Sequence, residues 1–444
     1  MNHIFFDVTN LRLYLESRRR LSGIQRVTVM LIEYTSRQIG GHKVFLSFHD
    51  ATTDTYNVVS YKAIEAIGGV LSIDALDAGL YRKKSIPVRP TLKRYRRKPV
   101  KRAVYTTIRN INAALGNHRH FERRDSTLEA WRASAKTPKV VTTSAHSTEA
   151  FQDFFAVAQP GDHLILADAS WSVPIAPLKK AQSLGISCNF LIHDLIQIKA
   201  PEMIGGTRQS QIFHDWLLET TRFVDSYLAN SEATARDLRE FLNTYGTDQR
   251  IDVVPLARAG LPVLPEAEPK RPSARPVNAE IYPRLAQTAH ISDEIRCLLK
   301  RPYVLCVGTM EARKNVWGLA QAWDRLRHQD DIELPKLVFA GNPGWLNDDF
   351  DSLMAKTGNL YGWVKQVLSP SDQELDFLYR NCLFTAMPSF LEGWGLPVGE
   401  SLSYGKTAVV SEASSLPEVG GELVLYFDPH SISSMTATIY RMLS

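Results

Sequence analysis

The chain has 444 residues, 44% of them hydrophobic, and a formal net charge of +5. This length exceeds one ordinary hydrophobic core, so we expect two domains with the composition of a soluble globular protein. No apolar run is long enough to span a bilayer. Residues 1–7 lack the basic and then apolar layout of a secretory signal and instead predict a first strand.

Short apolar runs alternate with helical patterns along the chain, which is typical of parallel α/β units. The strands expected in the first half are 4–8, 44–48, 164–167, 188–192, 227–229 and 253–256. Those expected in the second half are 303–307, 337–340, 364–368, 383–387, 408–410 and 424–427.

Residues 262–302 are rich in Pro and Ala and separate these two sets of strands. We therefore predict an N-terminal Rossmann-like domain of residues 1–260, a linker of residues 261–302 and a C-terminal Rossmann-like domain of residues 303–444. Two doubly wound sheets arranged in this way predict a central cleft, in which a ligand binds beyond the carboxyl ends of the strands.

Positive charge is concentrated in residues 82–102, which contain eleven of the 52 Lys and Arg residues and no acid. The rest of the chain has 41 bases against 47 acids, so it is acidic apart from this insert. The insert could bind anionic lipid headgroups, the pyrophosphate of a lipid-linked acceptor or nucleic acid, or it could be a solvated loop. Tyr81 and Tyr95 do not form a convincing stacking pattern for nucleic acid.

The four cysteines show no paired spacing, and we expect buried free thiols without disulfides or zinc. They are Cys188, Cys297, Cys306 and Cys382. No metal site is expected either: no Asp-x-Asp pair stands at a strand end, and residues 118–120 (His-Arg-His) lie in a polar, basic stretch.

The most informative segment is a glycine-rich turn that follows the strand expected at residues 383–387. Gly393 and Gly395 allow a ligand to approach the main chain closely. Pro397 suits the start of a helix that continues to Tyr404. The unpaired N–H groups of that helix start form an anion site.

Glu392 and Glu400 flank this turn and could accept hydrogen bonds from hydroxyl groups at the two ends of a nucleotide sugar. The alternative is an ordinary strand–turn–helix joint in which Glu400 favours the helix dipole.

Three further segments lie at expected strand ends. Arg313 and Lys314 follow strand 303–307, where the charge of a diphosphate would be neutralised, although such a pair is often only a solvated surface. Asn315 is expected to cap the next helix. His193 and Asp194 end strand 188–192; the histidine could be structural, and Asp194 could orient it. Gly23 and Arg26 open the helix after the first strand.

These segments resemble the retaining nucleotide-sugar glycosyltransferases of family 4, which have the two-domain GT-B fold. The resemblance rests on the Glu-x7-Glu string that ends at Glu400 and on the Gly-Thr-x-x-x-Arg-Lys-Asn loop of residues 308–315. It extends over residues 401–406, 414–421 and 426–429. Trp394 stands where Phe is commoner in the family, and Thr309 where many members have Arg.

The resemblance implies three sets of site residues. The catalytic residues it implies are His193, Lys314 and Glu392. The donor-binding residues it implies are Gly23, Arg313, Gly393, Trp394, Gly395, Leu396 and Glu400. The residues it implies on the acceptor side are Arg26 and Asp194. It implies no metal and no cofactor besides the nucleotide-sugar substrate.

The resemblance also implies the reaction, which is transfer of a hexose with retention from a nucleoside-diphosphate sugar to a glycan or lipid-linked glycan. The strings Glu-Gly-Trp-Gly-Leu-Pro and His-Asp-Leu-Ile look like those of mannosyl- and rhamnosyltransferases of bacterial surface polysaccharides, including lipopolysaccharide. They favour GDP-mannose or a GDP-deoxyhexose.

We expect a cytoplasmic protein that is peripheral on the inner face of the cytoplasmic membrane through residues 82–102, with no nucleic-acid partner. The alternatives are a GT-B epimerase or phosphorylase, or a catalytically dead membrane-bound scaffold. One helix follows Asp428 and Pro429 where the family usually continues, so we expect a C-terminal domain cut short or one module of a longer polypeptide.

Overall fold

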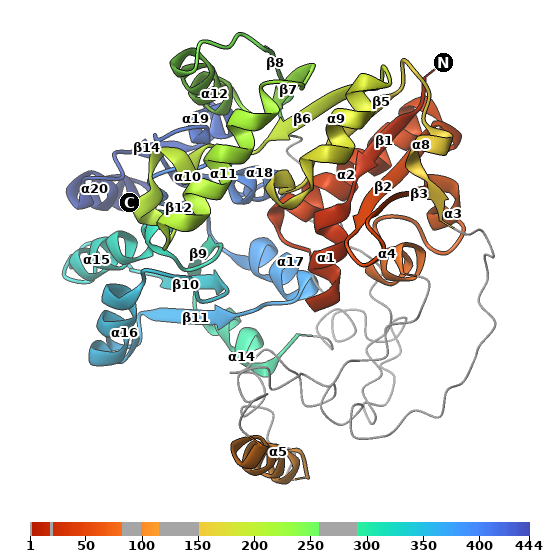
Figure 1. The fold of residues 1–444 in the computed structure, drawn as a ribbon. Coiled ribbons are helices and arrows are strands. Elements are labelled where there is room, and N and C mark those ends of the chain that lie inside the picture. Colours follow the sequence, from red (N-terminus) through yellow and green to blue (C-terminus); the bar gives the residue numbers. More distant parts are fainter. Residues whose placement is uncertain (1, 18–20, 82–98, 115–150, 257–290) are drawn as a thin grey trace.

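The computed structural model describes residues 2–17, 21–81, 99–114, 151–256 and 291–444. These residues form two α/β units, one built on an eight-stranded sheet and the other on a six-stranded sheet (Figure 1). The fold class expected from the sequence, two doubly wound Rossmann-like units in the GT-B arrangement, is confirmed.

The N-terminal sheet has the strand order β4-β3-β2-β1-β5-β6-β7-β8. Its strands are β1 (Ile4–Asp7), β2 (Val44–Asp50), β3 (Thr55–Ser60), β4 (Gln152–Asp153), β5 (His163–Leu166), β6 (Ser187–Ile192), β7 (Ser226–Ala229) and β8 (Arg250–Val253). Strand β1 pairs in parallel with both β2 and β5, in a register that sets Phe5 beside Phe45 and Leu164. Adjacent residues of β1 enter different cores, Phe5 on one face and Phe6 on the other, so the sheet is buried on both sides.

Two features of this sheet differ from the sequence prediction. Strands β3 and β4 were not expected, and both pair antiparallel at one edge. The strand expected at residues 253–256 lies at Arg250–Val253 instead. Edge strands carry polar residues on their solvent side, as Arg250 and Asp252 do here, so they lack the apolar run that marks a central strand.

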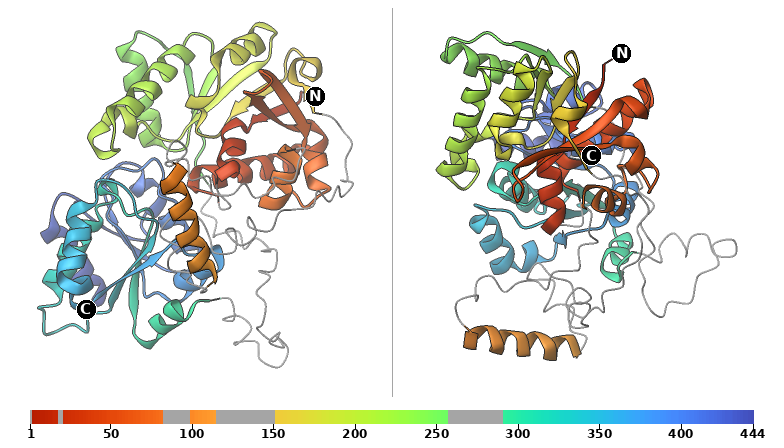
Figure 2. Two further views of the ribbon diagram at one scale, coloured as in Figure 1. Left: turned by 60° about the horizontal axis from the view of Figure 1, so that its bottom comes forward. Right: turned by 45° about the vertical axis from the view of Figure 1, so that its right-hand side comes forward.

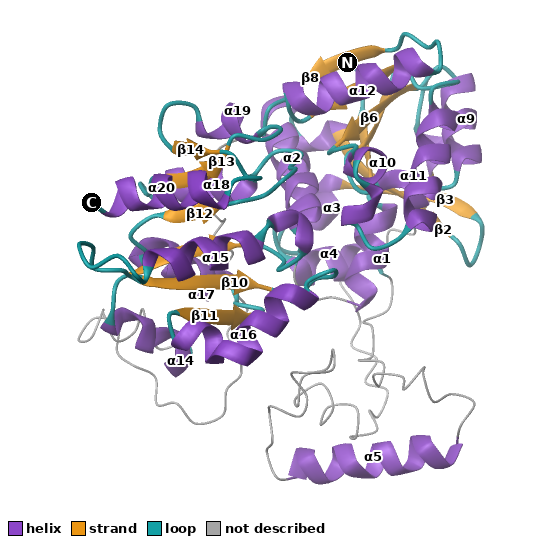
Figure 3. Cartoon of the chain, turned by 90° about the vertical axis from the view of Figure 1, so that its left-hand side faces the viewer, coloured by secondary structure: helices purple, strands orange, loops and turns teal. Residues whose placement is uncertain are grey.

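Helices cover both faces of the N-terminal sheet (Figure 2). They are α1 (Thr9–Ser17), α2 (Gly23–Ile39), α3 (Tyr61–Glu65), α4 (Ile73–Leu80), α8 (Phe154–Val157), α9 (Ile175–Ser183), α10 (Ile196–Lys199), α11 (Thr207–Thr220) and α12 (Glu232–Thr244). Helix α5 (Pro99–Ala114) stands apart from both sheets (Figure 3). Residues 82–98 of the basic insert lie outside the described residues.

The C-terminal sheet is parallel throughout, with the order β11-β10-β9-β12-β13-β14. Its strands are β9 (Tyr303–Val307), β10 (Lys336–Gly341), β11 (Val364–Leu368), β12 (Thr385–Met387), β13 (Ala408–Ser411) and β14 (Leu425–Phe427). Its helices are α14 (Asp293–Arg296), α15 (Val316–Leu326), α16 (Asp348–Tyr361), α17 (Asp372–Asn381), α18 (Leu396–Ser403), α19 (Leu416–Gly420) and α20 (Ile432–Leu443). The strand order reverses between β9 and β12, which is where ligands bind in doubly wound sheets.

Most of the segment expected to be a linker, residues 261–302, lies outside the described residues. In its described end, Ile291 and Ile295 are buried in a core with Tyr303 of β9. Within the described ranges every helix is too short or too polar to cross a bilayer.

All four cysteines are free thiols, as expected, but Cys297 is exposed and not buried. It opens a short 3-10 turn after α14, and its side chain lies at the surface.

Candidate functional site

The loops after β9 and β12 lie side by side at the point where the C-terminal sheet reverses its strand order. The first loop carries Arg313 and Lys314, and the second carries the glycine-rich turn. A pocket lies between these loops and is lined by Gly308, Thr309, Lys314, Met387, Pro388 and Ser389, among others. The pocket is therefore built from two of the segments that the sequence singled out.

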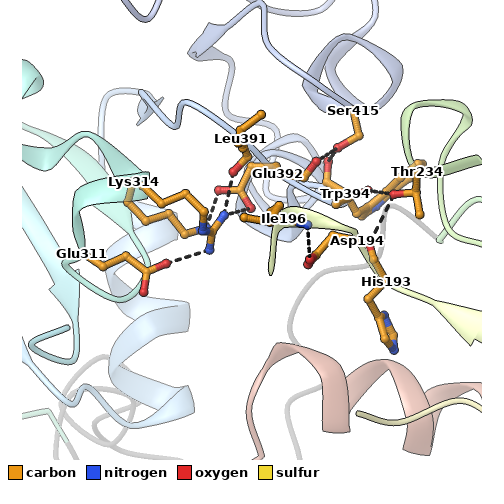
Figure 4. Close-up of polar contacts among 12 residues, drawn as sticks. His193, Asp194, Ile196, Thr234, Glu311, Lys314, Leu391, Glu392, Trp394 and Ser415 are labelled. Atoms are coloured by element: carbon orange, nitrogen blue, oxygen red, sulfur yellow. Dashed lines mark hydrogen bonds and ion pairs between the residues drawn. The ribbon is translucent and has the colours of Figure 1, made fainter. Parts of the chain in front are cut away.

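The carbonyl groups of the glycine-rich turn are held by hydroxyl groups from both domains, of which Figure 4 shows those of Ser415 and Thr234. Ser415 Oγ lies 3.0 Å from the carbonyl oxygens of both Glu392 and Trp394, and its one hydrogen is shared between them. Ser231 Oγ donates to the carbonyl of Gly393, which lies between those two residues, at 2.9 Å. Three consecutive carbonyls are thus occupied by the protein itself.

The N–H groups of the same turn are not occupied. Among the described residues, no hydrogen bond involves the N–H of Gly393, Trp394 or Gly395. Gly395 has φ +105° and precedes α18, whose first turn contains Pro397. Only glycine adopts this φ without strain, and unpaired N–H groups before a helix form an anion site. The turn is therefore arranged to receive an anionic group.

Glu392 is the centre of a buried ion-pair cluster (Figure 4). Its Oε1 accepts a hydrogen bond from Lys314 Nζ, and its Oε2 lies 3.0 Å from Arg313 Nη1. Arg313 Nη2 donates to Glu311 at 2.7 Å, and Nη1 donates to the Leu391 carbonyl at 2.6 Å. Burial alone would raise the pKa of Glu392, but Arg313 and Lys314 outweigh it and lower that pKa to about 2. Two cations are thus held in place beside the pocket.

Asn315 does not cap α15 through its side chain, which corrects the sequence prediction. The residue has the left-handed conformation, φ 51° and ψ 35°, which asparagine tolerates better than most residues. Its Nδ2 donates instead to the carbonyl of Pro429 at 3.0 Å. The asparagine therefore ties the Arg313–Lys314 loop to the segment before α20.

Glu400, one turn into α18, is buried and already has partners for both of its carboxylate oxygens. Arg26 Nη1 from the N-terminal domain lies 3.1 Å from Oε1, and the hydroxyl of Tyr379 donates to Oε2 at 2.7 Å. Burial raises the pKa of Glu400, and the positive charge of Arg26 opposes that rise. The structure thus places Arg26, expected on the acceptor side, against the carboxylate expected on the donor side.

His193 meets the turn through its backbone and not through its ring. A Cβ atom added at Gly393 would lie 2.0 Å from the His193 carbonyl oxygen, so the two domains touch here at a point that only glycine allows. The ring points away from the Glu392 cluster (Figure 4), and its Nε2 lies 2.9 Å from the carbonyl of Ala167. Burial lowers the pKa of His193, which favours the neutral imidazole.

Among the described residues no hydrogen bond joins Asp194 to the His193 ring, and Asp194 Oδ1 accepts from the N–H of Ile196 at 3.1 Å. Gly23 begins α2 and faces Leu396 across the domain interface: an added Cβ would lie 3.3 Å from the Leu396 Cδ1. Both residues therefore lie near the turn. Gly23 packs against Leu396, and Asp194 bonds to the backbone of Ile196.

The sequence reading missed several residues at this site. Asp168 follows β5 and is 2% exposed. Its Oδ1 accepts from Gln25 at 3.0 Å, and its Oδ2 has no hydrogen-bond partner among the described residues. An acidic residue directly after an expected strand is a sequence pattern from which Asp168 could have been predicted. No comparable pattern marks Ser231, Ser415 or Tyr379 as site residues.

The described residues contain no group of three or more His, Cys, Asp or Glu side chains that could hold a metal ion. His118 and His120 lie outside those residues.

Comparisons with known proteins match parts of this chain to glycosyltransferases. Residues 290–444 match the model of the family Glycosyl transferases group 1. O-antigen chain mannosyltransferase B of Escherichia coli is 38% identical over 141 residues, which are 32% of this chain and 36% of that protein. The serotype-specific mannosyltransferase WbdA of Escherichia coli is 23% identical over 257 residues, which are 57% of this chain and 28% of that protein. These matches thus span about a third of each relative's length or less.

Among solved structures, HepE of Anabaena in complex with UDP and glucose is 12% identical with a TM-score of 0.49, over 99% of this chain and 89% of that one. The chain therefore has two Rossmann-like units in the GT-B arrangement, its residues 290–444 match the glycosyl transferases of group 1, and it resembles bacterial mannosyltransferases over part of its length.

Proposed function

We propose that the chain is a retaining glycosyltransferase that moves a hexose from a nucleoside-diphosphate sugar to a glycan or lipid-linked glycan of a bacterial surface polysaccharide. One observation carries this proposal: Lys314 lines a pocket whose second lining loop, at Pro388 and Ser389, leads into the turn with unpaired N–H groups. Arg313 and Lys314 both pair with the buried Glu392 of that loop. The names of the mannosyltransferase relatives favour mannose as the hexose. The resemblance of the strings Glu-Gly-Trp-Gly-Leu-Pro and His-Asp-Leu-Ile is the basis for proposing a GDP sugar, with mannose or a deoxyhexose.

In this proposal the diphosphate lies on the N–H groups between Gly393 and Leu396 and draws Lys314 away from Glu392. Glu392 then accepts hydrogen bonds from the hexose hydroxyls that replace the lysine, so that its buried charge keeps a partner. Glu400 holds the ribose hydroxyls in the same way, beside Tyr379.

The chemistry depends on positioning and charge stabilisation, with no strong nucleophile. The acceptor hydroxyl attacks the anomeric carbon from the face that the diphosphate leaves and passes its proton to the departing phosphate oxygen. Lys314, Arg313 and the turn N–H groups stabilise the charge that develops on that oxygen. We propose that these groups perform the neutralisation without a divalent ion or another cofactor.

Two other functions would use the same pocket. A GT-B epimerase or phosphorylase would release nucleotide or sugar phosphate without a glycan acceptor. A dead scaffold would bind nucleotide without turnover. Release of nucleoside diphosphate that depends on the acceptor separates a transferase from both.

A panel of nucleotide sugars tests the proposal directly. We expect one of them, with GDP-mannose first among the candidates, to raise the melting temperature and to be hydrolysed slowly when no acceptor is present. A ligand at 100 times its Kd stabilises the folded state by about 2.7 kcal/mol, which thermal unfolding detects. A chain that no nucleotide sugar stabilises would refute the proposed function.

We further propose that the protein lies on the inner face of the cytoplasmic membrane and does not bind nucleic acid. Residues 82–114 contain no acid, and residues 99–114 of that stretch form α5. On α5 the side chains of Val104, Ile108 and Ile111 are exposed and recur at helical spacing, so they share one side of the helix. Basic residues that precede this helix in the sequence, together with its apolar face, favour an anionic bilayer.

Replacing Val104, Ile108 and Ile111 together with glutamine is expected to weaken binding to vesicles of phosphatidylglycerol and phosphatidylethanolamine by about tenfold or more, because the apolar contact with the bilayer is lost. Sedimentation with vesicles measures the effect, and Leu184→Gln, another exposed apolar position, serves as the control. Binding that is equal in the triple variant and the wild type would contradict a role for this helix face.

A further inference from the structure

We infer that Glu418 is a positioning residue that joins the two domains and thereby sets the geometry of the donor-binding turn. Glu418 does not contact the pocket, and it lies in the short helix α19 of the C-terminal domain. The inference rests on the proposed function, because it concerns how the donor site is assembled.

The carboxylate of Glu418 binds the start of α12, a helix of the other domain. Its Oε2 accepts from the N–H of Glu232 at 2.7 Å, and its Oε1 accepts from the N–H of Ala233 at 2.9 Å. These N–H groups have no partner within their own helix, and the start of a helix carries partial positive charge. The contact therefore combines two charge-assisted hydrogen bonds across the interface between the domains.

The two helices that Glu418 connects also hold the turn. Ser231, the N-cap of α12, donates to the Gly393 carbonyl at 2.9 Å, and Thr234 Oγ1 lies 3.3 Å from the same oxygen. Ser415, the N-cap of α19, holds the Glu392 and Trp394 carbonyls at 3.0 Å. The start of α12 thus holds the carbonyl of Gly393, and the start of α19 holds the two carbonyls on either side of it.

These contacts make the shape of the turn depend on the contact between the domains. If α12 moves away, Gly393 loses both hydroxyl groups at its carbonyl, while Ser415 still holds the carbonyls on either side. The Gly393 peptide is then free to rotate and to turn its oxygen towards the diphosphate. Glu418 opposes that separation, so the population of the binding-competent turn depends on it.

Glu418→Ala tests this dependence, with Glu418→Gln as the conservative variant and Glu422→Ala as the control at an exposed glutamate of the same domain. Ser231 is a poorer choice, since its hydroxyl also accepts from the N–H of Thr234 and caps α12. The first measurement is amide hydrogen exchange over residues 230–236 without any ligand. We expect faster exchange at Glu232 and Ala233 in Glu418→Ala and unchanged exchange in Glu422→Ala.

The second measurement is the affinity for GDP-mannose by calorimetry. Coupling between sites is typically worth 5- to 150-fold in affinity, so we expect Glu418→Ala to raise the Kd by about 5-fold or more. Glu418→Gln is expected to fall between it and the wild type, because its amide oxygen accepts a hydrogen bond but carries no charge. An unchanged Kd in Glu418→Ala, or unchanged exchange at Glu232 and Ala233, would overturn the inference. A wild-type protein that binds no nucleotide sugar would instead refute the proposed function, whereas the exchange data would still report on the contact between the domains.

Discussion

Lys314→Ala is expected to lower the rate of sugar transfer by about 10²- to 10³-fold, the usual cost of removing a group that stabilises developing charge in a transition state. In the structure the Lys314 ammonium borders the pocket and is held by Glu392. Charge on the departing diphosphate is greater in the transition state than in the bound donor. The loss is therefore expected in kcat as well as in kcat/KM, and initial-rate kinetics separates the two.

The fold is expected to tolerate this change, because Arg313 remains 3.0 Å from Glu392 and keeps that buried carboxylate paired. Lys356→Ala, at an exposed lysine of α16, is the matched control and is expected to transfer sugar at the wild-type rate. A Lys314→Ala enzyme with wild-type kcat would show that the leaving-group charge is stabilised elsewhere.

Glu392→Gln is expected to cause the largest loss of stability, about 3–5 kcal/mol, because it leaves two buried cations without their shared counter-charge. The pKa of Glu392 is lowered to about 2 from the ordinary value of 4.5. A lowered pKa stabilises the folded state fully above pH 4.5, and that contribution is lost as the pH falls towards 2. Urea unfolding at several pH values should therefore show the gap between wild type and variant closing below pH 4.5.

A double-mutant cycle separates the free energy contributed by this ion pair from a general loss of stability. Lys314→Met combined with Glu392→Gln removes one of the two cations, so the double variant is expected to be more stable than the sum of the single losses implies. Glu422→Gln serves as the control for loss of a negative charge. A Glu392→Gln protein whose free energy of unfolding is within about 1 kcal/mol of the wild type would contradict the stabilising role of the buried cluster.

A Glu392→Ala enzyme that hydrolyses the donor as fast as the wild type would contradict the proposed contact with the sugar.

Much of the fold could be predicted from sequence because its signals are local. Strands β9 and β11 are buried or partly buried runs bounded by turn residues, and their predicted limits match the structure. The start of α18 followed from the order of glycine and proline at Gly395 and Pro397, since each residue restricts its own backbone. Strands β4 and β8, at the two edges of the N-terminal sheet, and β3 beside β4 carry polar residues, and their place in the sheet depends on pairing with other strands.

The sequence by itself determined which chemical groups stand at the ends of strands: two cations after β9, two glutamates around a glycine turn and a histidine after β6. Only the tertiary structure decided how they pair. Glu392 is 78 residues from Lys314, Glu400 is 374 residues from Arg26, and Gly393 is 162 residues from Ser231. The direction of the His193 ring and the hydrogen bonds from Ser231 and Ser415 to the turn carbonyls also depend on tertiary packing. Backbone preferences act over a few residues. The contact of Glu392 with Lys314 arises only when β9 and β12 become neighbours in one sheet, and the other two contacts arise only when the two sheets are brought together.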